Sequence, residues 1–146
     1  MSESATKQTV RRLYEEVVNE GRLELLDEIA QPDHHEHNPL PGQVQGVEGL
    51  KQRVSMVRGA FNPRFTIEHL LEDGDKVAIM WSNQGTHLGE WLGVPPTGKT
   101  YVINGVDIFR LQDGRLAEHW DVVDVFGLMT QIGVLPAPSE TAGARA

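Results

Sequence analysis

The chain of 146 residues contains no cysteine, which excludes a disulfide framework, a thiolate zinc site and a cysteine nucleophile. Basic residues are scarce: 13 Lys and Arg stand against 21 Asp and Glu, so the formal net charge is −8. A surface this acidic argues against nucleic acid or an anionic membrane as a partner. No apolar run is long enough for a transmembrane helix, and the N-terminal stretch lacks a signal-peptide pattern. We therefore expect a cytoplasmic protein that binds neither nucleic acid nor a membrane.

The first part of the chain has helical periodicity. Apolar residues recur at helical spacing from Val10 to Val18, before Gly21, and similar patterns predict helices over residues 23–30 and 47–61. The segment between the second and third helix reads QPDHHEHNPLPGQVQG. Its three prolines, two glycines and lack of periodicity predict a loop.

After Pro63 the pattern changes to that of strands joined by the turn signals DGD and QDG. The predicted strands cover residues 64–72, 76–88, 100–111 and 115–123. The order of elements predicts an α+β fold in which helices cover one face of a curved antiparallel sheet, and such a cone can enclose a pocket. We expect one domain over residues 1–133 and a disordered tail over 134–146.

Asp121 interrupts the last predicted strand, where a buried carboxylate is costly. The preceding turn decides which side chains share its face. We favour a three-residue QDG loop, in which Gly105 faces Asp121 and Asp107 faces His119; a two-residue turn would put Asp107 opposite Trp120. A slip by one residue would reverse the faces. On the favoured register an apolar wall holds two acids and a histidine, with open space at Gly105.

These residues form the candidate catalytic group. An apolar wall raises the pKa of a carboxyl group, which suits Asp121 to general acid/base work, although a structural acid has equal support. Asp107 would orient and charge His119, which would polarise an oxygen or shuttle a proton; a solvated cross-strand pair is the alternative. Tyr14 and Trp81 would line a site for an aromatic ligand or belong to the core.

The stretch DHHEH offers nitrogen and oxygen atoms to a metal ion. Its spacing matches no zinc pattern, and adjacent histidines in an extended segment point apart, so we expect no metal. We expect this loop to lay His37 and Asn38 over the mouth of the pocket instead.

The opposite face of the last two strands is also apolar, with Val102, Val106, Ile108 and Val122 among its residues. Three helices cannot cover both faces of the sheet. A second copy of the chain is the simplest cover, so we expect a homodimer through this outer face.

A combined pattern runs through residues 6–133: besides the helical front end it includes GVEGLKQRVSMVRGAF, GVPPTGK, GVDIFRLQDGRLAEHWDVVD and GLMTQIG. It resembles the SnoaL-like polyketide cyclases of the nuclear transport factor 2-like superfamily. The resemblance implies a cone-shaped fold and a homodimeric, cofactor-free enzyme of secondary metabolism. Its best-known members close a polyketide ring by aldol condensation with an aspartate that Asp121 matches. Where this chain has Gly105 and Asp107, those cyclases carry Gln and His.

The resemblance therefore implies a ring closure on a hydrophobic, polyketide-like small molecule. Asp121 would remove a proton next to a carbonyl, and His119, His37 or Asn38 would stabilise the enolate. One alternative is an epoxide hydrolase or epoxide-opening cyclase that uses both Asp107 and Asp121; a polyketide hydroxylase is another. A small-molecule binding protein without catalysis is the alternative outside enzymes.

Overall fold

The computed structural model describes residues 2–136. Its helices are α1 (Ala5–Arg12), η1 (Leu13–Val18), η2 (Leu23–Leu25), α2 (Leu26–Ile29), α3 (Val47–Phe61) and α4 (Val125–Gln131). Its strands are β1 (Ala30–Glu36), β2 (Arg64–Asp73), β3 (Lys76–Thr86), β4 (Thr100–Gln112) and β5 (Arg115–Val123). The three predicted helices and the four predicted strands are all present.

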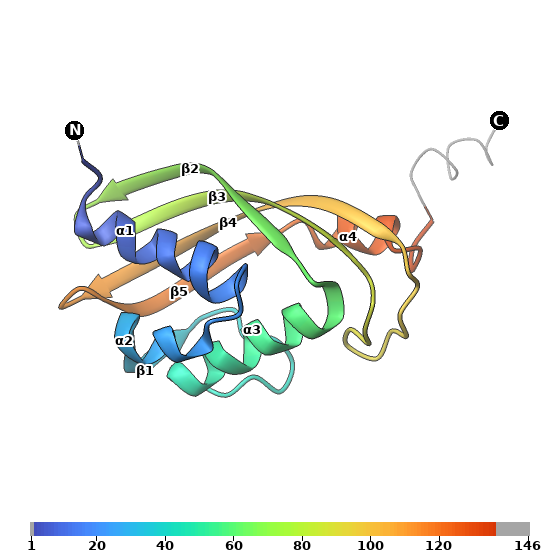
Figure 1. The fold of residues 1–146 in the computed structure, drawn as a ribbon, viewed down its shortest axis with the longest axis horizontal. Coiled ribbons are helices and arrows are strands. Elements are labelled where there is room, and N and C mark those ends of the chain that lie inside the picture. The colour runs from blue at the N-terminus through green and yellow to red at the C-terminus, as the bar shows by residue number, and fades with distance from the viewer. Residues whose placement is uncertain (1, 137–146) are drawn as a thin grey trace.

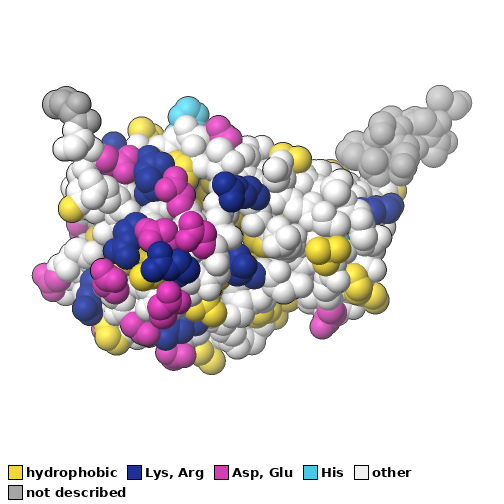
Figure 2. Space-filling view, in the orientation of Figure 1, with side chains coloured by type: hydrophobic (Ala, Val, Ile, Leu, Met, Phe, Trp, Pro, Cys, Tyr) yellow, Lys and Arg dark blue, Asp and Glu magenta, His cyan; other side chains and the backbone are white. Residues whose placement is uncertain are grey.

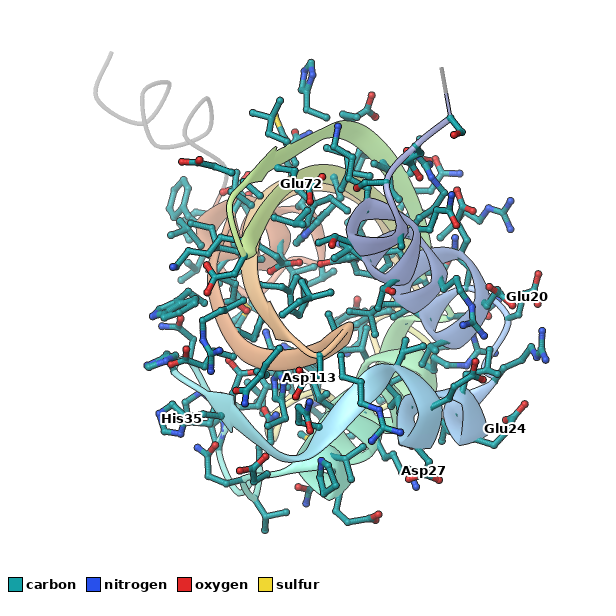
Figure 3. All side chains as sticks on the ribbon, turned by 90° about the vertical axis from the view of Figure 1, so that its left-hand side faces the viewer. Glu20, Glu24, Asp27, His35, Glu72 and Asp113 are labelled. Atoms are coloured by element: carbon teal, nitrogen blue, oxygen red, sulfur yellow. The ribbon has the colours of Figure 1, made fainter. Side chains whose placement is uncertain are left out.

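The five strands form one curved sheet in the order β1-β5-β4-β3-β2, with β1 parallel to β5 and the other neighbours antiparallel. Figure 1 shows α1 lying across the long strands and α4 following β5. Seen end-on, the sheet curls around an interior that the helices close from the other side (Figure 3). This is the α+β cone that the order of elements predicts.

The first helix begins at Ala5, because the hydroxyl of Ser4 accepts a hydrogen bond from the backbone N–H of Lys7 at 3.1 Å. It continues without a break into η1, a π-helical turn. That turn buries Tyr14 against the sheet. The helix ends before Gly21, whose φ of 77° suits a glycine.

Strand β1 occupies the first part of the segment for which we predicted a loop, so that prediction is wrong for residues 31–36, whereas residues 37–46 form no helix or strand. His34 and Glu36 occupy its inward positions and are buried. Because the buried positions are polar, the strand shows no alternation of apolar residues. His34 Nδ1 lies 3.0 Å from the carbonyl oxygen of Leu116, which satisfies one ring nitrogen against β5.

The turn between β4 and β5 has two residues, so the predicted three-residue loop is wrong. Gln112 pairs with Arg115, and the connecting Asp113 and Gly114 both have positive φ, 52° and 75°. Positive φ at both central residues is what a type I′ hairpin requires. Asp113 marks the tip of this hairpin in Figure 3.

A β-bulge then shifts the pairing between Arg110 and Leu111. Beyond it Asp107 lies opposite Asp121, and Gly105 lies opposite Val123 rather than Asp121. The pairing differs from the predicted one by two positions, an even number. The predicted inward face is therefore correct although the register is not.

The core fills the space between the concave sheet face and the helices. Its fully buried side chains include Val10, Val17, Leu26, Val77, Ile79, Phe109, Leu116 and Ile132. Charged side chains of both signs gather over the N-terminal helices (Figure 2), where Arg11 pairs with Glu3 and Arg12 pairs with Glu16 and Glu28. No helix among residues 2–136 has the length and apolar character that crossing a membrane requires. The tail predicted over 134–146 lies outside the described residues from 137 onward.

Candidate active site

A cavity of about 310 Å³ lies between the concave face of the sheet and the helices. Its wall is mostly apolar. The polar residues that line it are Tyr14, Asn38, Arg53, Asn83, Tyr101, Asp107, His119 and Asp121, together with the indoles of Trp81 and Trp91. We call the group of Glu36, Arg53, Asp107, His119 and Asp121 the acid end of the cavity.

Asp107 is buried and accepts three hydrogen bonds. Its Oδ2 accepts from the hydroxyl of Tyr14 and, at 2.7 Å, from the indole Nε1–H of Trp81. Its Oδ1 lies 3.0 Å from Nε2 of His119. Burial and the charge of Asp107 raise the pKa of Tyr14 well above its ordinary value, so the phenol stays neutral and donates. Tyr14 and Trp81 therefore lie in the cavity as predicted, and both hold Asp107.

Gly105 does not open space beside Asp121, and the prediction of such a space is wrong. Gly105 pairs with Trp81 across β3 and β4, and a Cβ on Gly105 would overlap the indole ring. The missing side chain is what allows the indole to lie over β4 and reach Asp107. Gly105 itself is absent from the cavity lining.

His119 bridges two carboxylates. Nε2 faces Asp107, and Nδ1 lies 2.7 Å from Oε1 of Glu36. Burial alone would lower the pKa of His119, but the hydrogen bonds to Asp107 and Glu36 outweigh it and raise the pKa to about 9. Burial would raise the pKa of Glu36, but the hydrogen bond and the charge of His119 lower it. At neutral pH the ring is therefore an imidazolium that donates from both nitrogens.

Asp121 is the carboxylate of the acid end with the fewest protein donors. Its Oδ2 pairs with the guanidinium of Arg53 and lies 3.9 Å from Nε2 of His119. Burial raises the pKa of Asp121, although Arg53 and His119 act against this rise. Within the acid end three carboxylates face two cations, so a proton on Asp121 would balance the charge. The backbone N–H of Asp121 donates to Oδ1 of Asn38 at 2.9 Å, which turns the amide of Asn38 toward this carboxylate.

His37 lies outside the cavity, contrary to the prediction. Its ring stacks on Trp120 with centroids 4.4 Å apart and bonds to Glu118 at 3.0 Å. Side chains alternate along an extended segment, so His37 points away while Asn38 reaches the cavity wall as predicted. His35, two residues earlier, also points away from the interior (Figure 3).

The family model of the SnoaL-like polyketide cyclases matches residues 8–132 of the chain. The chain belongs to this family. It is 30% identical over 118 residues to the nogalonic acid methyl ester cyclase of Streptomyces nogalater, covering 79% of this chain and 88% of that protein. It is 29% identical over 131 residues to the aklanonic acid methyl ester cyclase DauD of Streptomyces sp. (strain C5), covering 85% and 79%.

Among solved structures, TsrD from Streptomyces laurentii is similar with a TM-score of 0.84 and 28% identity, over 92% of this chain and 99% of that one. These matches confirm the predicted family and the cone-shaped fold. They also confirm the prediction of an enzyme of the polyketide cyclase type.

Asp107, His119 and Asp121 offer ligand atoms that all lie within 4.8 Å of one another, close enough to surround a cation. In this geometry a metal ion would have to displace Arg53 from Asp121 and the proton that His119 donates to Asp107. Two protonated side chains thus already supply the positive charge that a metal would bring.

Two residues of the acid end, Glu36 and Arg53, were not predicted from the sequence. Arg53 follows Leu50 by three residues and precedes Val57 by four, so it lies beside the apolar stripe of α3. A charged residue at that position is a signal for a buried partner. Glu36 gave no such signal, because its strand was not predicted.

Proposed function

We propose that this protein closes a ring of a polyketide-like substrate by an intramolecular aldol condensation, with Asp121 as general acid/base. The carboxylate removes a proton from a carbon next to a carbonyl group, and the resulting enolate carbon attacks a second carbonyl of the same molecule. A carbon–carbon bond forms, and the carbonyl π electrons move to oxygen. Asp121 returns the proton to that alkoxide, so no external oxidant or cofactor is consumed.

The observation that carries this proposal is the position of Asp121 in the charged end of a mostly apolar cavity. Burial raises its pKa, which makes the carboxylate a stronger base near neutral pH. Its neighbour Arg53 supplies a positive charge, and the Nδ2 of Asn38 has no hydrogen-bond partner among residues 2–136. These two donors are suited to an enolate or alkoxide oxygen that forms beside Asp121.

His119 has a less direct part in this scheme. Both of its nitrogens already donate to carboxylates, so the ring has no hydrogen left for a substrate oxygen. Its charge nevertheless lies close to Asp121. In our proposal His119, held by Asp107 and Glu36, favours the ionised form of Asp121 in the free enzyme and so helps to prepare the base.

Flat, hydrophobic polyketides are suited to the cavity, whose wall combines aromatic and aliphatic side chains. The methyl esters of nogalonic and aklanonic acid, which the relatives' names specify, are the first substrates to test.

Asp121→Asn keeps the shape of the side chain and removes the base. We expect turnover of a methyl ester substrate to fall by about 10²–10⁴-fold, while the dissociation constant changes little. Asp113→Asn, at the exposed hairpin tip, is the matched control and should leave turnover unchanged. Full activity of Asp121→Asn would refute the proposed role, whereas binding without turnover by the wild type would favour a binding protein.

Epoxide opening is the second candidate, because Asp107 and Asp121 are cross-strand partners in one cavity. It requires a second carboxyl group that is free to activate water or to protonate the epoxide. The three hydrogen bonds to Asp107 argue against that freedom. An assay with matched epoxide and open-chain diketone substrates separates the two: faster consumption of the epoxide would favour the second candidate.

The proposed enzyme is a homodimer through the outer face of the sheet. Val102 and Val122 are 59% and 77% exposed there; Val106 lies opposite Val122, and Ile108 is on the same face of β4. An apolar sheet face of this kind is stabilised by burial against a second copy. Val106→Glu should convert a dimer into a monomer in analytical ultracentrifugation. Val44→Glu, at an exposed position before α3, should not; a monomeric wild type would contradict the proposal.

A further inference from the structure

The cavity has a second polar group, far from the acid end. Asn83 on β3 is only 5% exposed and lines the cavity. It lies four residues along β3 from Ile79, the cross-strand partner of Asp107. At the rise of a β-strand this separates the two positions by about 13 Å. Between them the strand presents Trp81, so the two polar groups lie at opposite ends of an apolar surface.

The amide of Asn83 is held from one side only. Its Oδ1 accepts a hydrogen bond from the hydroxyl of Tyr101 at 3.4 Å. Burial raises the pKa of Tyr101 to about 12, so this phenol stays neutral and keeps its proton. The ring of Tyr101 is fixed in turn, edge-on to Phe61 with centroids 5.2 Å apart, and its hydroxyl lies over Gly85. We call Asn83 and Tyr101 the amide end of the cavity.

The Nδ2 group of Asn83 has no hydrogen-bond partner within residues 2–136. This nitrogen is not one of the fully buried side-chain atoms that lack a partner among residues 2–136, so it is accessible from the cavity that Asn83 lines. The cross-strand partner of Asn83, Ile103, is apolar and offers this donor no acceptor. The donor therefore bonds to whatever fills the cavity, water in the free protein or an oxygen atom of a ligand that displaces the water.

We infer that Asn83 is a specificity-determining residue whose amide binds a carbonyl or hydroxyl oxygen at the end of the substrate remote from the reacting carbon. The inference rests on the proposed function, since the acid end defines where the reaction takes place. It specifies the substrate further: a molecule with an oxygen at each end and an apolar middle. A substrate without the distal oxygen would leave the Asn83 donor unpaired and would bind more weakly.

Two tricyclic probes test this inference without any turnover. One is an anthracene with a hydroxyl on one outer ring, and the other carries a hydroxyl on each outer ring. Binding is followed by quenching of Trp81 and Trp91, which both line the cavity. We expect wild-type protein to bind the second probe roughly two- to tenfold more tightly, the contribution of one hydrogen bond.

Asn83→Leu, which keeps the volume and removes the donor, should bind both probes equally. Asn83→Ala is the second variant in case leucine disturbs the fold, and it should behave in the same way. Ile103→Val, on the cross-strand partner of Asn83, changes the cavity shape without changing its polarity and should keep the wild-type preference.

The inference is overturned if the wild type binds the two probes equally or binds neither. It is also overturned if the preference for the second probe survives in both Asn83 variants, or if Ile103→Val loses that preference. The probe experiment measures binding alone, so its result does not depend on whether Asp121 catalyses a reaction. Asp121→Asn tests that function by turnover, and its failure would leave the probe preference unaffected.

Discussion

The acid end and the amide end of the cavity share one packing arrangement but differ in charge. At each end an aromatic residue pairs across the sheet with a glycine: Trp81 with Gly105, and Tyr101 with Gly85. In each pair the missing Cβ gives the ring or its hydroxyl room against the neighbouring strand. Trp81 donates to a carboxylate within a group of five ionisable side chains, whereas Tyr101 donates to one neutral amide. One packing arrangement can thus support either a charged cluster or a neutral amide.

The largest expected difference between the ends is in stability. Asp107→Asn removes a buried charge on which three donors converge and leaves His119 with one carboxylate partner. We expect the free energy of unfolding to fall by about 3–5 kcal/mol, as is typical when one partner of a buried ion pair is removed. Urea denaturation measures this change. A loss below that of Asn83→Leu would show that the acid end contributes less to stability than the amide end.

A rise in pH is a milder change at the acid end, because it removes a proton from His119 and leaves the carboxylates in place. The pKa of His119 is raised in the folded state from 6.5 to about 9, so its contribution to stability is fully present below pH 6.5. That contribution is lost as the pH rises from 6.5 through about 9. We expect the urea midpoint of the wild type to fall across this window and that of His119→Gln to change much less. Parallel curves for the two proteins would contradict the assignment of an imidazolium.

The shared packing device predicts similar penalties at the two glycines. Gly105→Ala forces a Cβ into the indole of Trp81, and Gly85→Ala places one 2.7 Å from the backbone carbonyl oxygen of Phe61 and 2.8 Å from the hydroxyl of Tyr101. Overpacking of this kind costs about 1–3 kcal/mol, measured by thermal or urea unfolding. In the background of Trp81→Phe the cost of Gly105→Ala should shrink, and a cost that stays the same would mean that the indole is not the obstacle.

The smallest expected effect belongs to the amide end. Asn83→Leu removes a single long hydrogen bond, the 3.4 Å contact with the hydroxyl of Tyr101, and replaces the amide with an apolar side chain of similar volume. We expect a change in unfolding free energy of at most about 1 kcal/mol in urea denaturation. A large loss would indicate that Asn83 serves the fold more than the ligand.

Most of the architecture could be predicted because its elements carry local signals. Helix α3 and strands β2 to β5 have clear periodicity and turn residues, whereas β1 buries His34 and Glu36 and so resembles a loop. Because β1 was not predicted, Glu36 was not recognised as a residue of the acid end. The side of the sheet on which Asp121 lies was predicted correctly. The shorter turn and the bulge each shift the pairing of β4 with β5 by one residue, and a total shift of two leaves every side chain on its predicted face.

The contacts within the site depend on groups that are distant in the sequence. Nothing local shows that Arg53 on α3 meets Asp121 on β5, or that Trp81 occupies the space at Gly105. His37 was misplaced for a related reason: it and Asn38 are neighbours, and only one of two adjacent side chains can face the cavity.

The spacing of these contacts along the chain has a consequence for folding. Glu36 and His119 are 83 residues apart and Tyr14 and Asp107 are 93 apart, whereas Asn83 and Tyr101 are separated by 18. Contacts between distant segments carry a higher loop-closure entropy and slow folding. On a ribosome the amide end can form once β4 has begun to emerge, but the Glu36–His119 contact must wait for β5. During synthesis we therefore expect the amide end to form before the acid end.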